Sequence, residues 1–93
     1  MLVKGNFCSY TLVDTHQLEK INLEIRAILK TERIKAGLSM NRLGEIAGLS
    51  QQAISYLERD MRDPSLDTLL RVSAAIGVDF SKVVTEAEKK AKK

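Results

Sequence analysis

The sequence predicts an all-α protein made of five helices in one small domain. Three serines and two aspartates each precede a run with helical apolar spacing, and such side chains are favoured N-caps. Glycine follows several of these runs, as it commonly does where a helix ends. Beyond the first thirteen residues nothing in the chain has the character of a strand. With 93 residues, the chain is near the lower end of what buries a core of its own.

Composition limits the classes of function. No apolar run approaches the ~18 residues of a membrane span, and the first residues lack the basic region and apolar run of a signal peptide. We therefore expect a cytoplasmic protein with no membrane contact. Cys8 is the one cysteine, which excludes an internal disulfide. The net charge of +3 permits nucleic-acid binding without demanding it.

Residues 1–17 are interpreted as an N-terminal arm, 18–85 as the domain and 86–93 as a charged tail. Phe7–Val13 is rich in aromatic and β-branched residues, which favours an extended strand. Such a strand needs a partner: it could pair with its copy in a second subunit or drape over the domain, and a disordered arm is equally compatible. The tail lacks large apolar residues, so we expect it to be frayed.

The first helix is predicted to begin at a cap on Asp14 or Thr15, to run to about Ala36 and to end at Gly37. It carries two apolar stripes on nearly opposite faces. A helix of this kind usually buries both, so the second stripe points to the arm or to a partner subunit. The first stripe is Leu18, Ile21, Ile25, Ile28, Leu29 and Ala36, and the second is Leu23, Ala27 and Ile34.

Two short helices follow, over about 40–47 and 51–59, with a tight turn at Gly48-Leu49 between them. Gly48 suits a position with positive φ, and Gly44 suits a close approach of the two helices. Residues 60–64 are a loop, and the fourth helix begins at the cap Ser65 and ends at Gly77. Asp79 caps a short fifth helix that carries Phe80, Val83 and Val84. The middle pair has the layout of a helix-turn-helix, whose second helix enters the DNA major groove.

The third helix has a narrow apolar side, formed by Ile54 and Leu57. Its other side is an arc of about 140° at 100° per residue, made of Gln51, Gln52, Ser55, Tyr56 and Arg59. Glutamine can offer a donor and an acceptor together to the edge of adenine. Glutamines are also good helix formers on any solvated surface, and composition alone does not separate the two interpretations. The tight turn before the helix favours DNA.

Residues 25–84 resemble the phage repressor and Cro family of helix-turn-helix regulators, the XRE-like proteins with the lambda-repressor-like fold. The resemblance covers about two-thirds of the chain, and its motifs are specific in their joint order and spacing. They are Arg33, Gly37-Leu38-Ser39, Leu43, Ile46-Ala47-Gly48-Leu49-Ser50, Ile54-Ser55, Leu57-Glu58-Arg59, Pro64-Ser65, Leu69 and Ala75-Ile76-Gly77-Val78.

The resemblance implies a compact five-helix lambda-repressor-like bundle that binds operator DNA, usually as a dimer. It implies base contacts by Gln51, Gln52, Ser55 and Tyr56, and a structural ion pair between Arg33 and Glu58. Helix two often begins with a phosphate-binding glutamine in this family, and Met40 stands there instead. The residues expected to contact the DNA backbone are Ser39, Met40, Asn41, Arg42, Ser50, Arg59 and Arg62.

Charge is unevenly distributed. Between residues 38 and 64 three arginines oppose four acids, which gives a sum of −1. The helix-turn-helix is therefore not basic by itself, and much of the positive charge lies near the end of helix one and in the tail. We expect a modest salt dependence of DNA binding for each monomer.

No catalytic, metal-binding or cofactor-binding constellation is present, since His16 and Cys8 are the only residues of their types. We expect no enzyme, but a nucleoid-associated transcriptional regulator, more a repressor than an activator. A dimer would bind a palindromic operator with half-sites ~34 Å apart. The dimer could use the arm with Leu23, Ala27 and Ile34, or helix five with Phe80, Val83 and Val84. The alternatives are a protein-interaction module, or an antitoxin or controller protein that also binds DNA.

Overall fold

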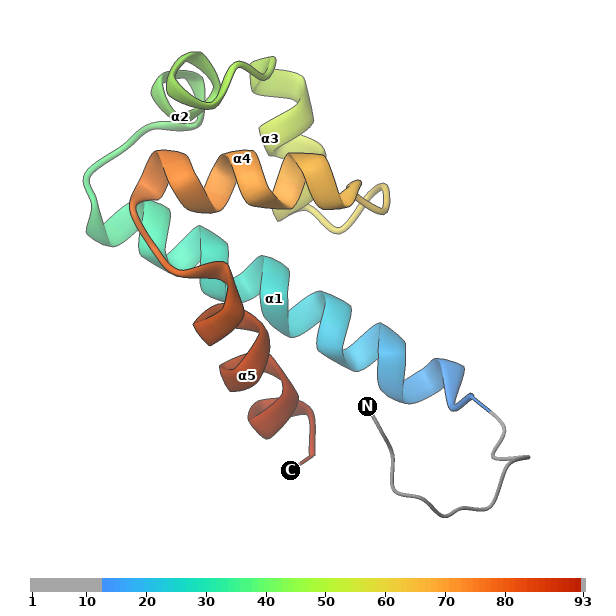
Figure 1. Cartoon of the computed structure of the whole chain (residues 1–93). Helices are drawn as coiled ribbons and strands as arrows, with labels where there is room; N and C mark the ends of the chain where they lie inside the picture. The colour runs from blue at the N-terminus through green and yellow to red at the C-terminus, as the bar shows by residue number, and fades with distance from the viewer. Residues whose placement is uncertain (1–12, 93) are drawn as a thin grey trace.

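The computed structural model describes residues 13–92, and these residues form five helices and no strand. The all-α prediction is therefore confirmed for this part of the chain. The strand expected over residues 7–13 lies almost entirely outside the described residues. The helices, shown in Figure 1, are α1 (Thr15–Lys35), α2 (Met40–Ala47), α3 (Gln51–Glu58), α4 (Leu66–Ile76) and α5 (Phe80–Ala91).

Every helix begins where local capping chemistry places it. An oxygen of each N-cap side chain accepts a hydrogen bond from a backbone N–H two or three residues further on, which satisfies one of the free donors of the first turn. Gly48 and Gly77 end α2 and α4 in the left-handed region, at φ 75° and 90°. The caps are Asp14, Ser39, Ser50, Ser65 and Asp79.

One hydrophobic core joins the five helices. Its most buried large side chains are Leu29, Leu43, Ile54, Leu57 and Val72, contributed by α1, α2, α3 and α4. Val83 and Ala87 extend this core into α5. In Figure 1, α1 runs the length of the molecule, with α2, α3 and α4 gathered at its C-terminal half and α5 beside its middle. None of the helices in this described part is long and apolar enough to cross a membrane.

The apolar stripes of α1 are only partly covered. Ile28 and Leu29 are buried, but Leu18 of the same stripe is 54% exposed. It lies in the first turns of α1, which project beyond the other helices (Figure 1). Leu23 and Ile34 of the second stripe are 48% and 57% exposed. Burial of both stripes is therefore not achieved by residues 13–92 alone.

The C-terminal segment departs from expectation. α5 continues to Ala91, with Ala87 and Ala91 only 0% and 6% exposed, so the expectation of a frayed tail from residue 86 is wrong. The segment lacks large apolar residues, but its alanines let one helix lie close to another. Val83 is buried and Phe80 packs on the same core. Both side chains pack within the monomer, whereas Val84 is half-buried and lies outside this core. The helix-five dimer surface of Phe80, Val83 and Val84 stays a prediction.

Candidate nucleic-acid interface

The turn between α2 and α3 is held by glycine. A Cβ on Gly44 would lie 2.7 Å from the carbonyl oxygen of Leu49, a distance that side chains do not tolerate. The backbone N–H groups of Gly48 and Leu49 both donate to the carbonyl oxygen of Gly44. Leu49 is half-buried and packs against the core. These contacts fix the direction in which α3 leaves the turn.

α3 is divided between core and solvent, much as its sequence predicts. Ile54 and Leu57 are 0% and 2% exposed and anchor the inner side. Gln51 and Gln52 stand in solvent at the N-terminal end of α3, while Ser55 and Tyr56 are half-buried. The four side chains proposed to contact bases therefore lie on one helix, but the later pair is at the edge of the exposed surface.

Three side chains of the predicted interface are linked to each other. The Gln52 Nε2 atom donates a 2.6 Å hydrogen bond to the Tyr56 hydroxyl oxygen. The guanidinium carbon of Arg62, in the loop after α3, lies 4.9 Å from the centre of the Tyr56 ring. This distance suits a cation–π contact. Gln52, Tyr56 and Arg62, which we call the Gln–Tyr–Arg row, thus have defined relative positions before any ligand binds.

The N-terminal ends of α2 and α3 offer donors for phosphate. The hydroxyl oxygens of Ser39 and Ser50 accept hydrogen bonds from the backbone N–H groups of Arg42 and Ala53, at 3.0 Å each. Each serine keeps its own O–H as a donor. The N–H groups of the first turns carry the positive end of the helix dipole, which favours an anion.

Met40 differs from the other residues expected to contact the DNA backbone. Its side chain is half-buried and packs against the core, so the group it can offer a phosphate is its backbone N–H. Asn41, beside it, is exposed.

The arginines of this surface differ in how freely they can reach a phosphate. Arg42 is exposed and forms an equally exposed 3.1 Å ion pair with Glu45, which water screens strongly. Arg59 is exposed at the C-terminal end of α3. Arg62 is exposed and lies over Tyr56. All three side chains are therefore accessible to a ligand.

Arg33 and Glu58 form a two-armed ion pair between α1 and α3. Arg33 Nε donates to Glu58 Oε2, and Nη2 donates to Oε1 at 3.0 Å. The two side chains are 12% and 6% exposed. Arg33 also donates from Nη1 to the carbonyl oxygen of Leu38 at 2.6 Å. The pair therefore ties the C-terminal end of α3 to α1 and to the turn that leads into α2.

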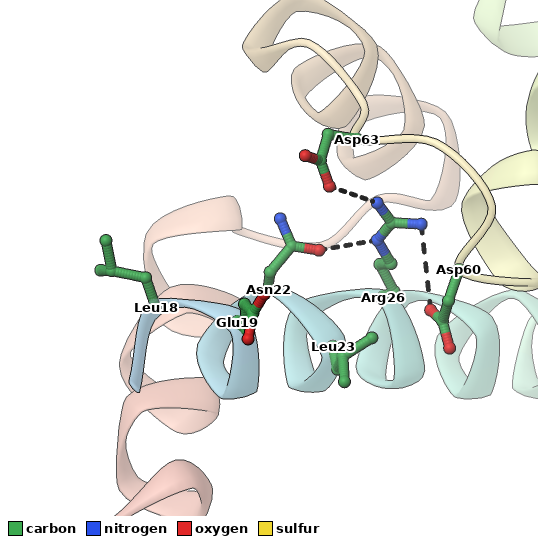
Figure 2. A pocket seen from close by; sticks show the side chains of 7 residues that line it. All are labelled: Leu18, Glu19, Asn22, Leu23, Arg26, Asp60 and Asp63. Atoms are coloured by element: carbon green, nitrogen blue, oxygen red, sulfur yellow. Dashed lines mark hydrogen bonds and ion pairs between the residues drawn. The ribbon is translucent and has the colours of Figure 1, made fainter. Parts of the chain in front are cut away.

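A second arginine of α1 was not singled out from the sequence. Arg26 is 4% exposed, and Figure 2 shows its guanidinium pointing from α1 toward Asp60 and Asp63. Its distances to these carboxylates are 3.9 Å and 3.2 Å. The available signal was its place three residues before Leu29, next to the buried stripe. An arginine at this position must either bury its charge against partners or extend its side chain away from the core. The need for such partners could have identified Arg26 from the sequence.

These two arginines change the charge of the helix-turn-helix. The sum of −1 over residues 38–64 counts Glu58, Asp60 and Asp63, each of which pairs with Arg26 or Arg33 of α1. Including both arginines raises the sum to +1. The charge inferred from sequence was therefore too negative, because the sum over a continuous segment left out two arginines of α1 that pair with acids of α3 and of the loop after it.

Comparisons with known proteins agree with this geometry. A family model described as helix-turn-helix matches residues 29–83. The HTH-type transcriptional regulator PuuR of Escherichia coli (strain K12) is 37% identical over 57 residues, which are 61% of this chain and 31% of PuuR. The immunity repressor protein of Bacillus phage phi105 is 36% identical over 66 residues, which are 71% of this chain and 43% of that repressor.

A solved structure is also similar. The crystal structure of the clp gene regulator ClgR from Corynebacterium glutamicum has a TM-score of 0.70 and 26% identity, and the match covers 77% of each chain. Coverage of the sequence relatives is smaller, since this chain spans about a third of the length of PuuR. The shared part includes α2, the turn and α3.

Proposed function

This chain belongs to the helix-turn-helix family of transcriptional regulators, and from that premise we propose that it binds a specific sequence of double-stranded DNA. The observation that carries the proposal is the exposed pair Gln51 and Gln52 at the N-terminal end of α3, with the Gln–Tyr–Arg row beside it. In a helix-turn-helix, the N-terminal residues of the second helix contact base edges in the major groove.

Base recognition is assigned to Gln51, Gln52, Ser55 and Tyr56. A glutamine amide matches the donor and acceptor of adenine, and serine can pair with several bases. Tyr56 can turn the edge of its ring toward a thymine methyl group. Because Ser55 and Tyr56 are half-buried, we expect the two glutamines to make the larger contribution to sequence discrimination.

Phosphate contacts are assigned to both helix starts and to the exposed arginines. Ser39, Asn41 and Ser50 offer neutral donors, as do the backbone N–H groups of the first turns, including that of Met40. Arg42, Arg59 and Arg62 supply the charge. Few cations are involved, so the logarithm of affinity should fall modestly with the logarithm of salt concentration, by about 0.9 for each phosphate neutralised.

We further propose that the protein acts as a repressor, as a dimer on a palindromic operator, and associates with DNA in the cytoplasm. The likeness to a phage immunity repressor supports repression. The exposed Leu23 and Ile34 of α1 support a second subunit, since large apolar side chains in solvent commonly mark an interface. Half-sites one helical turn apart, ~34 Å, would place two copies of α3 in successive major grooves.

Selection from a randomised double-stranded DNA library tests the proposal. The wild type should enrich a palindromic motif. The double variant Gln51→Ala, Gln52→Ala should lose or relax that motif, because it removes both base-reading amides. Gln17→Ala is the matched control, since it removes the same amide from the far end of α1. A folded wild type that enriches nothing at low salt would overturn DNA binding and favour a protein-interaction module.

A further inference from the structure

Arg26 is a buried cation whose hydrogen bonds go mainly to the backbone. Its Nη1 donates to the carbonyl oxygens of Tyr56 and Leu57, at 3.4 Å each, and its Nη2 donates to the carbonyl oxygen of Arg62 at 2.5 Å. The first two carbonyls belong to the last turn of α3, where the negative end of the helix dipole favours a cation. One guanidinium thus contacts the helix end and the loop that follows it.

The carboxylates near Arg26 contribute less than these carbonyls. The side chain of Asp63 is 92% exposed and that of Asp60 is 50% exposed, so water screens both charges. On α1 itself, the Oδ1 atom of Asn22 accepts a 2.7 Å hydrogen bond from Arg26 Nε. Figure 2 shows this contact, which fixes the plane of the guanidinium on the α1 side. The arginine is therefore oriented by α1 and bonded to the chain after α3.

The loop bound by Arg26 has an unusual backbone. Asp60 has φ 58°, the left-handed region that residues other than glycine rarely adopt. The N–H of Met61 donates to the carbonyl oxygen of Tyr56 at 3.1 Å, which closes the turn directly after α3. Arg26 bonds to the same carbonyl and to that of Arg62, so it spans this turn from one side to the other.

Arg62 connects the buried contacts of Arg26 to the surface. Its carbonyl is bound by Arg26, while its guanidinium lies over Tyr56, whose hydroxyl receives the Gln52 amide. The backbone of Arg62 must be fixed for its side chain to stay over the ring. The backbone of the last member of the Gln–Tyr–Arg row is therefore bound by an arginine of α1 that is itself only 4% exposed.

We propose that Arg26 is a positioning residue, which holds the loop so that Arg62 neutralises a phosphate beside the base-reading side chains. This inference rests on the proposed DNA binding. It assigns Arg26 no contact with DNA, and it predicts that removing Arg26 has the same effect on binding as removing the charge of Arg62.

The variant Arg26→Met tests the assignment, since methionine fills much of the same volume and the two carboxylates that it leaves without a partner, Asp60 and Asp63, are exposed to water. Both Arg26→Met and Arg62→Gln should lower the salt slope by about 0.9, equivalent to one phosphate. Between 50 and 200 mM salt, each variant should therefore lose about 3.5-fold less affinity than the wild type. Lys20→Met is the matched control for charge, because it removes one exposed cation from α1.

The double variant Arg26→Met, Arg62→Gln decides between positioning and an independent effect. Positioning predicts that it binds no more weakly than either single variant, because both changes remove one contact. Effects on affinity that multiply, or an unchanged salt slope in Arg26→Met, would overturn the inference. Absence of DNA binding by the wild type would instead overturn the proposed function.

A measurement without DNA separates the two proposals further. In the wild type, the Arg62 side-chain protons should show an NMR ring-current shift from Tyr56, and Arg26→Met should abolish it. Persistence of that shift in the folded variant would overturn the inference. If Arg26→Met does not fold, Asn22→Ala replaces it and Asn22→Asp is its rescue, since aspartate keeps the acceptor for Arg26 Nε. Equal salt slopes for Asn22→Ala and wild type would then contradict positioning.

Discussion

The Gln52 side-chain nitrogen donates a 2.6 Å hydrogen bond to the hydroxyl oxygen of Tyr56, one turn further along α3. This bond uses one of the two N–H groups of the amide and fixes which way the amide faces. The other N–H and the carbonyl oxygen remain available. Adenine offers matching groups at N7 and N6, so we expect Tyr56 to orient Gln52 for this base in the proposed complex.

Tyr56→Phe should therefore relax base discrimination more than it lowers affinity. Phenylalanine keeps the ring for Arg62 but frees the Gln52 amide to turn over. A bidentate contact to a base contributes about 1–3 kcal/mol of discrimination. We expect the preference for adenine at the Gln52 position to fall by about 5-fold, or about 1 kcal/mol. Competition binding with single-base operator variants measures this, and an unchanged preference would show that Tyr56 does not orient the amide.

The Arg33–Glu58 pair yields a prediction about stability. Arg33→Met leaves the 6% exposed Glu58 carboxylate without its partner, which should lower the free energy of unfolding by about 3–5 kcal/mol. Adding Glu58→Met removes the stranded charge and should restore most of that loss. Urea unfolding of both variants measures the difference. A double variant as unstable as Arg33→Met would mean that lost packing, rather than the unpaired charge, dominates.

Local chemistry explains why so much of the fold was predictable. A cap such as Ser50 bonds to an N–H three residues away, and Gly48 adopts positive φ for reasons contained in one turn. Such short-range rules predicted the bounds of α2 correctly, and they predicted the bounds of α1 and α3 to within one residue. The exposed Gln51 and Gln52 followed from helical periodicity and the buried Ile54.

Contacts between distant segments were not predictable in the same way. Arg26 is 30 to 36 residues from Tyr56, Leu57 and Arg62, and periodicity does not predict which carbonyls a buried guanidinium will contact. The charge of the helix-turn-helix was misjudged for the same reason. The alanines of α5 were overlooked because a small side chain carries little hydropathy, although it permits close helix packing.

Asp79 should give the domain a dependence on acidic pH. Hydrogen bonds from the hydroxyl and backbone N–H of Ser81 to its carboxylate, at 2.7 Å and 3.0 Å, hold the pKa of Asp79 below its usual 3.8. The positive charge of Lys82 acts in the same direction. A folded-state pKa below the unfolded one adds stability that is present above pH 3.8 and is lost as pH falls through the folded value.

Titration of the Asp79 carboxyl carbon by NMR measures that value. Ser81→Ala should raise the pKa of Asp79 toward 3.8, because it removes the largest of the lowering contacts. Ser65→Ala is the control, since it deletes a hydroxyl from the N-cap of α4 and leaves Asp79 untouched. A titration curve of Asp79 that is unaltered in Ser81→Ala would show that the hydroxyl does not bond to the carboxylate in solution.

The C-terminal half of α5 makes the last prediction, because the sequence and the structure disagree there. Ending the chain at Thr85 removes the methyl groups of Ala87, which lies in the hydrophobic core, and of Ala91, which is also buried. At about 0.8 kcal/mol for each buried carbon, the free energy of unfolding should fall by about 1.5 kcal/mol. The exposed ion pair of Lys90 and Glu86 adds little to this loss.

Urea unfolding again provides the measurement, with Glu88→Ala in the full-length chain as the control for an exposed position of the same segment. That control should lie within about 0.5 kcal/mol of the wild type. A truncated chain with the wild-type urea midpoint would mean that the segment from residue 86 to Ala91 does not pack on the domain in solution. A lowered midpoint would instead mean that the last turns of α5 stabilise α1. Since α1 carries Arg26 and Arg33, those turns would also support the contacts at the end of α3.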